Sequence, residues 1–297
     1  MTEEFAAVGG GITLAYERFG DAGDPLLLIA GIGQQLHAWP TPFCEQLADR
    51  GYQVVRFDNR DAGRSTHLDY RPPSPLATLA RRWPPQQYDL GDMAADTAGL
   101  LDVLGWDRAH IVGMSMGGMI GQLVAVRTPA RVRTLTSIMS TPWVLRTGRP
   151  ALSTLRRMLG RPPASRAEAA DRLVRMYRHI GSHGFPFDEA AVRAYAELSW
   201  DRGGKPAGFP RQLAAIVKSG DRTAALRSIT APTLVVHGDR DRMVHPTGGA
   251  ATARAIPGAR HETITGMGHD LPRGAWPVLL DLIDQHARRS ADAAPQS

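Results

Sequence analysis

The chain has 297 residues, 43% of them hydrophobic and 22% charged, which is the balance of a globular protein able to bury a full core. Its formal charge of +6 comes from arginines spread along the chain without a nucleic-acid-binding motif, and this argues against a nucleic-acid partner. A single cysteine, Cys44, excludes an internal disulfide, and the histidines lack metal-ligand spacing. We therefore expect no metal and no cofactor.

The beginning of the chain argues against secretion. Its first five residues contain two acids where a signal peptide needs bases, and no apolar run reaches the length of a membrane span. We expect a cytoplasmic protein without a membrane partner, and the oligomeric state stays open.

The first hundred residues predict strands that alternate with helices. One strand is an unbroken apolar run of the kind that burial on both faces requires. The second helix ends at a glycine, which is typical of a C-cap. The expected strands are Gly11–Phe19, Pro25–Ala30 and Gln53–Phe57, and the expected helices are Ala38–Arg50 and Leu90–Leu104.

The loop after Pro25–Ala30 contains two glycines, Gly31 and Gly33. Together with Asp58 at the end of the next strand, it imitates a dinucleotide-binding fingerprint. However, Leu36 stands where the third glycine of that fingerprint belongs, and it would keep a helix from packing closely on the strand. This substitution disfavours a nucleotide cofactor.

A polar loop, Asp58–Ser65, follows the strand that ends at Phe57. Asp and Asn side chains readily hydrogen-bond to nearby backbone in turns, so we interpret this loop as structural and not as catalytic. The proline-rich stretch Pro72–Pro85 then predicts an excursion on the surface.

The most informative motif is Gly113–Gly118, with the sequence Gly-Met-Ser-Met-Gly-Gly. It lies between an apolar strand, Ala109–Met114, and a helix, Met119–Arg127, which is the context that a G-x-S-x-G nucleophile elbow requires. So tight a turn has no room for side chains two residues to either side of the serine. The geometry pushes the Ser115 hydroxyl out of the sheet, where it can react.

Such an elbow also predicts where an oxyanion is stabilised. The amide of Met116 and the N-terminal end of the following helix point at negative charge that forms beside the serine. A second amide comes from the loop after the strand Pro25–Ala30, and we choose that of Ile32.

Strand signals disappear after the strand Val132–Met139 and return at Pro232–Val236. The sequence predicts an α/β fold with a mostly parallel central sheet flanked by helices. Its core comprises residues 1–141 and 228–297, and a helical cap, 142–227, is inserted between two strands. Nine arginines between residues 146 and 178 are interpreted mainly as a solvated face. The helices expected in the cap are Ala151–Leu159, Ser165–Ile180, Asp188–Leu198 and Pro210–Val217.

A serine nucleophile needs a histidine base, and the histidine needs an acid that holds its tautomer. His269 has small neighbours on a loop after the last predicted strand, His261–Ile264. Asp241 and Asp239 both follow the strand before it, and we favour Asp241 as the acid and Asp239 as a turn residue. Because parallel strands deliver their loops to one edge of a sheet, the three residues should converge there.

These stretches resemble a known family. Almost the whole chain is similar to the α/β-hydrolase superfamily. Three stretches look like its aclacinomycin methylesterase branch: Phe57–Thr66, Gly113–Gly118 and Pro232–Gly238. The resemblance implies an α/β-hydrolase fold, with Ser115, Asp241 and His269 as triad and the amides of Ile32 and Met116 as oxyanion hole. It further implies hydrolysis of a methyl ester on a bulky aromatic polyketide, a hydrophobic small-molecule substrate. Asp61 and Ala30–Gly33 depart from the family pattern.

The same triad would also serve a cofactor-free perhydrolase of the haloperoxidase type, a C–C bond hydrolase or a lactonase. A ligand receptor on this fold would usually lose a triad member, and epoxide hydrolases and haloalkane dehalogenases carry aspartate in place of Ser115. For specificity, we expect aromatic residues of the cap to line an apolar pocket above the serine. The pocket residues that we name are Trp39, Trp143, Tyr177, Phe185 and Trp200.

Overall fold

The computed structural model describes residues 2–143, 145–158, 160–203 and 207–292, with the backbone alone for 290–292. An eight-stranded sheet has the strand order β1-β2-β4-β3-β5-β6-β7-β8. β2 pairs antiparallel with β1 and with β4, and every other neighbouring pair is parallel. The strands are β1 (Glu4–Gly9), β2 (Ile12–Phe19), β3 (Asp24–Ile29), β4 (Tyr52–Phe57), β5 (Ala109–Met114), β6 (Val132–Ile138), β7 (Thr233–Gly238) and β8 (Arg260–Ile264).

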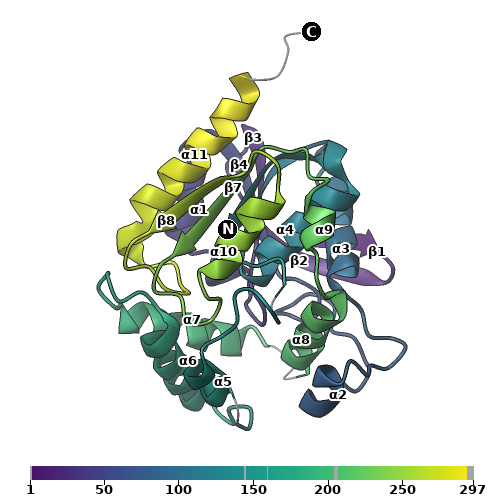
Figure 1. The fold of residues 1–297 in the computed structure, drawn as a ribbon, viewed down its shortest axis with the longest axis vertical. Helices are drawn as coiled ribbons and strands as arrows, with labels where there is room; N and C mark the ends of the chain where they lie inside the picture. The colour runs from purple at the N-terminus through teal and green to yellow at the C-terminus, as the bar shows by residue number, and fades with distance from the viewer. Residues whose placement is uncertain (1, 144, 159, 204–206, 293–297) are drawn as a thin grey trace.

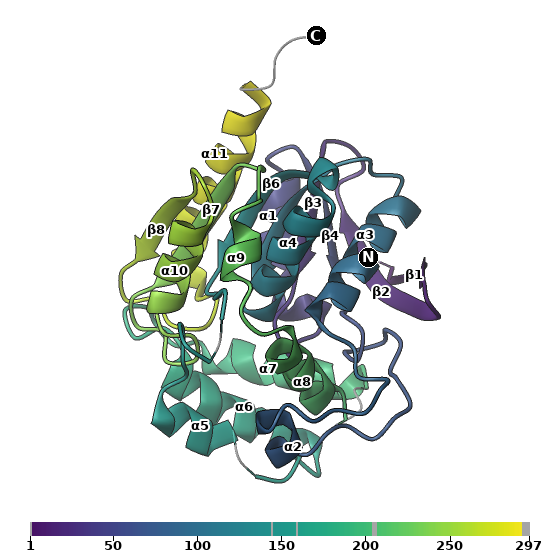
Figure 2. The ribbon, with the colours of Figure 1, turned by 45° about the vertical axis from the view of Figure 1, so that its right-hand side comes forward.

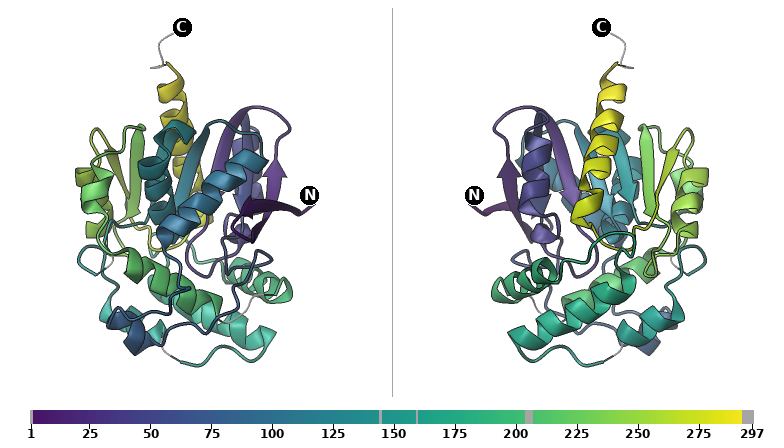
Figure 3. Two further views of the ribbon diagram at one scale, coloured as in Figure 1. Left: turned by 90° about the vertical axis from the view of Figure 1, so that its right-hand side faces the viewer. Right: turned by 90° about the vertical axis from the view of Figure 1, so that its left-hand side faces the viewer.

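Helices cover both faces of the sheet (Figure 3). On one face α1 and α11 share an apolar cluster with β3 and β4, in which Phe43 packs against Trp276. On the other face α3, α4, α9 and α10 share a second cluster. The central strands are therefore buried on both sides, which explains their continuous apolar sequences. The helices are α1 (Thr41–Ala48), α3 (Leu90–Val103), α4 (Met116–Arg127), α9 (Thr223–Leu226), α10 (Thr247–Ala255) and α11 (Trp276–Asp292).

Residues 142–227, which we call the helical segment, connect β6 to β7. Four of its helices lie together at one end of the sheet, and the short helix α2 (Pro75–Leu79) packs there against α8 (Figures 1 and 2). The described residues of the segment contain no strand. Its division from the core as a separate cap remains a prediction. The four helices are α5 (Leu152–Met158), α6 (Arg166–Ile180), α7 (Glu189–Asp201) and α8 (Gly208–Ser219).

Two elements differ from the expectation. β1 was not predicted, because it is an edge strand in which Ala6 is the one fully buried side chain and apolar alternation is weak. The helix expected at Ala38–Arg50 begins only at Thr41, where Pro40 precedes it and a proline occupies its first turn. The expected helix end at Leu159 lies outside the described residues. No helix in the described ranges combines the length and apolarity that crossing a bilayer needs.

Candidate active site

Ser115 occupies the sharp turn between β5 and α4. Its φ of 54° and ψ of −120° are a strained conformation for a residue with a side chain. A Cβ on Gly113 would lie 2.2 Å from the carbonyl oxygen of Gly117, and a Cβ on Gly117 would lie 2.1 Å from that of Ile29. Only glycine fits at either position. The Ser115 N–H donates to the Ile138 carbonyl at 2.9 Å, which ties the strained turn to β6.

Three side chains meet beside this turn. Ser115 Oγ lies 3.0 Å from His269 Nε2, and His269 Nδ1 lies 2.7 Å from Asp241 Oδ2. Because the carboxylate only accepts hydrogen bonds, Nδ1 carries the imidazole proton and Nε2 is free to accept from the serine hydroxyl. Ser115 and His269 are each 9% exposed, and Asp241 is 3% exposed. The structure thus brings together three residues that are distant in the sequence, in the order predicted from it.

Asp241 is held as a buried anion. Its Oδ1 accepts the N–H groups of Met243 and Val244, both at 2.8 Å. Burial by itself raises the pKa of the Asp241 carboxyl, but His269 and the hydrogen bonds from His237 and His269 outweigh it and hold the pKa at about 2. His237 Nε2 lies 3.2 Å from Oδ2 and 2.9 Å from the Val244 carbonyl. Both neighbours are acceptors, so this nitrogen carries a proton and donates to them.

Asp239 lies apart from His269. Its Oδ1 accepts the N–H of Gly266 at 2.7 Å, and the same carboxylate forms an ion pair of 3.7 Å with Arg240. The backbone N–H of Asp239 donates to the Ile264 carbonyl at 3.3 Å. Asp239 thus ties the loop after β7 to the loop after β8, which is a backbone-bonding contact of the kind expected of a turn residue. Of the two acids that the sequence left in competition, Asp241 is the one that contacts the histidine.

The loop after β3 also approaches Ser115. A Cβ on Gly31 would lie 3.3 Å from the Cβ of Ser115, so this loop touches the serine. The Ile32 N–H has no partner among the described residues. Met116 is the first residue of α4, and its N–H therefore lacks an acceptor within the helix. Among the described residues, neither of the two amides that the sequence nominated as oxyanion donors has a hydrogen-bond partner.

The helical segment bonds to the histidine loop. The His269 N–H donates to the Ile180 carbonyl at 2.7 Å. Ser182 Oγ accepts the Gly268 N–H at 2.9 Å and donates to Asp270 Oδ1 at 2.5 Å. Sequence reasoning missed these contacts, because nothing local marks Ser182 as a partner of a loop 86 residues away.

The Asp58–Ser65 loop has the structural role that the sequence predicted and also bonds to the helical segment. Asp58 accepts the Leu36 N–H at 2.6 Å and pairs with Arg202 at 3.0 Å. Asp61 binds Arg211 through two hydrogen bonds, of 2.7 and 2.9 Å. Its φ of 65° lies in the left-handed region that favours glycine, and aspartate is among the residues that tolerate it. This conformation explains why the family usually has glycine where this chain has Asp61.

Trp39, which we expected in a pocket wall, is instead fully buried in the core. It precedes α1 and packs against Phe43, so it presents no surface to a ligand. The ring belongs to the apolar cluster that α1 and α11 share with β3 and β4. The other four nominated aromatics lie in the helical segment, and their pocket role remains a prediction.

Two of these four contact the site loops or the core beside them. The Tyr177 hydroxyl accepts from Gln34 Nε2 at 3.2 Å, at the loop after β3. Phe185 packs against the α1–α11 cluster. Trp143 is partly buried with Arg146 over its ring, and Trp200 is 40% exposed. A ring that the sequence did not nominate, Phe209, lies so close to Gly33 that a Cβ there would be 2.8 Å from it.

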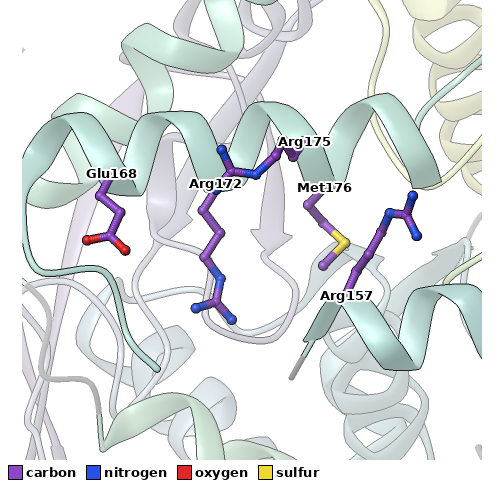
Figure 4. A pocket seen from close by; sticks show the side chains of 5 residues that line it. All are labelled: Arg157, Glu168, Arg172, Arg175 and Met176. Carbon is purple, nitrogen blue, oxygen red and sulfur yellow. The ribbon is translucent and has the colours of Figure 1, made fainter. Parts of the chain in front are cut away.

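Three arginines of the helical segment help to line a pocket on α5 and α6. The pocket has a volume of about 280 Å³ and is lined by four residues of α6 and by Arg157 of α5, all labelled in Figure 4. Arg172 in this pocket donates to the Met158 carbonyl, and Arg157 donates to the Ser153 carbonyl. These contacts fit the solvated face that the sequence predicted. Within the described residues, no group of three or more His, Cys, Asp or Glu side chains could hold a metal ion.

The fold and the site define a class of protein. Residues 24–272 match the alpha/beta hydrolase fold family, and the chain belongs to it. It is 32% identical to rhodomycin D methylesterase DnrP of Streptomyces peucetius, over 93% of this chain and 95% of that protein. This similarity confirms the methylesterase resemblance predicted from the sequence.

Solved structures agree with the family assignment. A hydrolase from Pseudomonas aeruginosa PA01 has a TM-score of 0.70 at 26% identity and covers 98% of each chain. The enol-lactonase from Burkholderia xenovorans LB400 has a TM-score of 0.74 at 20% identity, over 96% of this chain and all of that one, and it shares the fold.

Proposed function

We propose that this protein is a serine esterase that hydrolyses carboxylic esters of hydrophobic small molecules through an acyl-enzyme. The observation that carries the proposal is the continuous hydrogen-bonded line from Ser115 Oγ through His269 to Asp241, beside the unpaired amides of Ile32 and Met116. A serine on a sharp turn, a histidine base, a buried acid and two amide donors without partners among the described residues are the parts that acyl transfer needs.

In the first half-reaction, Ser115 Oγ attacks the ester carbonyl carbon while His269 Nε2 takes the hydroxyl proton. The carbonyl oxygen becomes an oxyanion, and the N–H groups of Ile32 and Met116 stabilise it. Asp241 stabilises the imidazolium that forms. When the tetrahedral intermediate collapses, the bond to the alkoxide breaks, and His269 delivers its proton to the departing alcohol.

In the second half-reaction, water attacks the acyl carbon and His269 takes a proton from it. The serine oxygen leaves and recovers that proton, so one ester and one water become one acid and one alcohol. For the substrate, the similarity to rhodomycin D methylesterase supports a methyl ester on a bulky aromatic acid. The partly exposed ring of Phe209 lies beside Gly33 and offers an apolar surface at the loop that contacts the serine.

The test is a panel of methyl and p-nitrophenyl esters, with identification of the acid and alcohol products. Ser115→Ala should lower kcat by about 10⁴-fold or more without changing the melting temperature by more than a few degrees, because the side chain serves the reaction and not the packing. A folded Ser115→Ala protein that kept a tenth of wild-type activity would refute the assignment of the nucleophile. Release of a peracid or of a C–C cleavage product in place of an acid and an alcohol would refute ester hydrolysis.

A further inference from the structure

The loop that supplies Ile32 is held by hydrogen bonds from Gln34 within the loop and from Gln212 outside it. Ile32 lies between Gly31 and Gly33, and Gly33 has a φ of 66°. Glycine restricts its own backbone very little, so the sequence of this loop alone does not fix the direction of the Ile32 N–H. An oxyanion donor must nevertheless be aimed before the reaction begins.

Two side-chain amides hold the peptide units on either side of the Gly31–Ile32 peptide unit. Gln34 Oε1 accepts the Gly31 N–H at 2.8 Å, and Gln212 Oε1 accepts the Gly33 N–H at 2.7 Å. These bonds hold the Ala30–Gly31 and Ile32–Gly33 peptide units, which flank the planar Gly31–Ile32 unit that carries the Ile32 N–H. The Gly31 carbonyl of that unit also accepts the Gln34 N–H, at 3.3 Å. Among the three successive N–H groups, that of Ile32 is left without a partner.

Gln212 comes from the helical segment and is completely buried in α8. Its Nε2 donates to the Arg60 carbonyl at 2.7 Å. The orientation of the Gln212 amide group follows from its partners, because the Gly33 N–H can only donate and the Arg60 carbonyl can only accept. The neighbouring ion pair of Arg211 with Asp61 holds the same turn of α8 against the core.

Resting on the proposed function, we infer that Gln212 is a positioning residue for the oxyanion hole: it clamps the Gly33 peptide so that Ile32 N–H points at the substrate oxygen. The residue does not touch the reacting atoms. Its effect should therefore appear in the acylation rate much more than in substrate binding. The helical segment would then contribute directly to the rate of the reaction, beyond any role in selecting the substrate.

The experiment compares Gln212→Met with Gln87→Met on the ester that the wild type hydrolyses best. Gln87 is a matched control, because it is also buried and donates to α8, at the Arg211 carbonyl, but does not contact the loop after β3. We expect Gln212→Met to lower kcat by about 10- to 100-fold, since displacement of a reacting group by about 1 Å has costs of that order. KM should change by less than about 3-fold. Gln87→Met should keep kcat within about 3-fold at a similar loss of thermal stability.

A second variant, Gln212→Glu, keeps the experiment decisive if the methionine variant does not fold. A protonated glutamic acid can accept from Gly33 and donate to Arg60, whereas the carboxylate cannot donate. Burial raises the pKa of a carboxyl, so the ratio of variant to wild-type kcat should rise several-fold as pH falls from 8 to 5.5. Gln87→Glu should show no such rise in kcat.

The possible results distinguish the proposed esterase function from the inference about Gln212. A wild-type enzyme with no esterase activity would refute the proposed function itself. An active wild type, combined with equal kcat losses in the Gln212 and Gln87 variants or with a Gln212→Glu ratio that is flat over pH, would overturn the inference about Gln212 alone.

Discussion

The sheet and the helical segment contribute to the site in different ways. The sheet delivers Ser115, Asp241 and His269 on loops at the ends of β5, β7 and β8, and it is stabilised by two continuous apolar clusters. The helical segment contributes apolar side chains to these clusters, and it also makes polar contacts with loops around the site. Four of these polar contacts are Asp58–Arg202, Asp61–Arg211, Gln212–Gly33 and Ser182–Gly268.

This difference has a physical consequence. Apolar burial is non-directional, and it stabilises the sheet without setting the angle of any one group. Hydrogen bonds and bidentate ion pairs are directional, and they are costly when one partner is removed. We therefore expect substitutions on the sheet loops to affect the reaction, and substitutions of the polar attachments to affect stability and the geometry of the site together.

The largest effect is expected at the acid of the sheet loops. Asp241→Asn should lower kcat by about 10⁴-fold, because asparagine cannot fix the tautomer of His269 or stabilise its charge. Asp239→Asn keeps an acceptor for the Gly266 N–H and should lower kcat by less than about 10-fold. Steady-state kinetics on one ester would measure both. If the two losses came out reversed, Asp239 would be the functional acid.

The next largest effect concerns an attachment of the helical segment. Arg211→Met should reduce the free energy of unfolding by about 3–5 kcal/mol, because it leaves the buried Asp61 carboxylate without its partner. The double variant Asp61→Gly/Arg211→Met should recover most of this loss, since it removes both charges and glycine suits the φ of 65°. Urea unfolding measures each variant. A double variant no more stable than Arg211→Met would contradict this account of the attachment.

The third prediction concerns substrate choice by the helical segment. We expect kcat/KM for a methyl ester of a multi-ring aromatic acid to exceed that for methyl acetate by at least about 10-fold, the result of roughly 1.4 kcal/mol of added apolar contact. Phe209→Ala should reduce this preference, because its ring lies beside Gly33. Trp39→Phe, in the core, should leave the preference unchanged. Equal kcat/KM for the two esters would refute an apolar pocket.

The smallest effect comes from a histidine inside the sheet. Burial, with smaller contributions from charges such as Arg133, lowers the pKa of His110 in β5 to about 4. The unfolded chain binds a proton near pH 6.5 and the folded one does not, so stability is full above pH 6.5 and falls as pH drops toward 4. Between pH 7 and pH 5, the free energy of unfolding of His110→Gln should therefore fall by about 1–2 kcal/mol less than that of the wild type. Urea titrations at both values test this, and equal losses would show that His110 is not the source.

The sequence by itself determined the fold class and nominated the serine that we propose as nucleophile. Apolar runs long enough for buried strands alternate with helical patterns. The two glycines that flank Ser115, Gly113 and Gly117, are visible in the sequence, and the structure shows that both lie too close to backbone atoms for any other residue. The sequence also reduced the acid to two candidates. These properties are local, and local chemistry is what a sequence shows directly.

Only the tertiary structure decided the rest. Asp241 and Asp239 are two residues apart with the same side chain, and which one meets His269 depends on how two loops pack. Trp39 was expected in a pocket wall but is buried in the core, because which side chains cover an aromatic ring depends on how distant elements pack. Gln212 lies 179 residues from Gly33, and no periodicity or motif marks such a pair. Contacts between distant segments follow from the packing of the whole chain, and so the residues that aim the oxyanion donor could not be found before the fold was known.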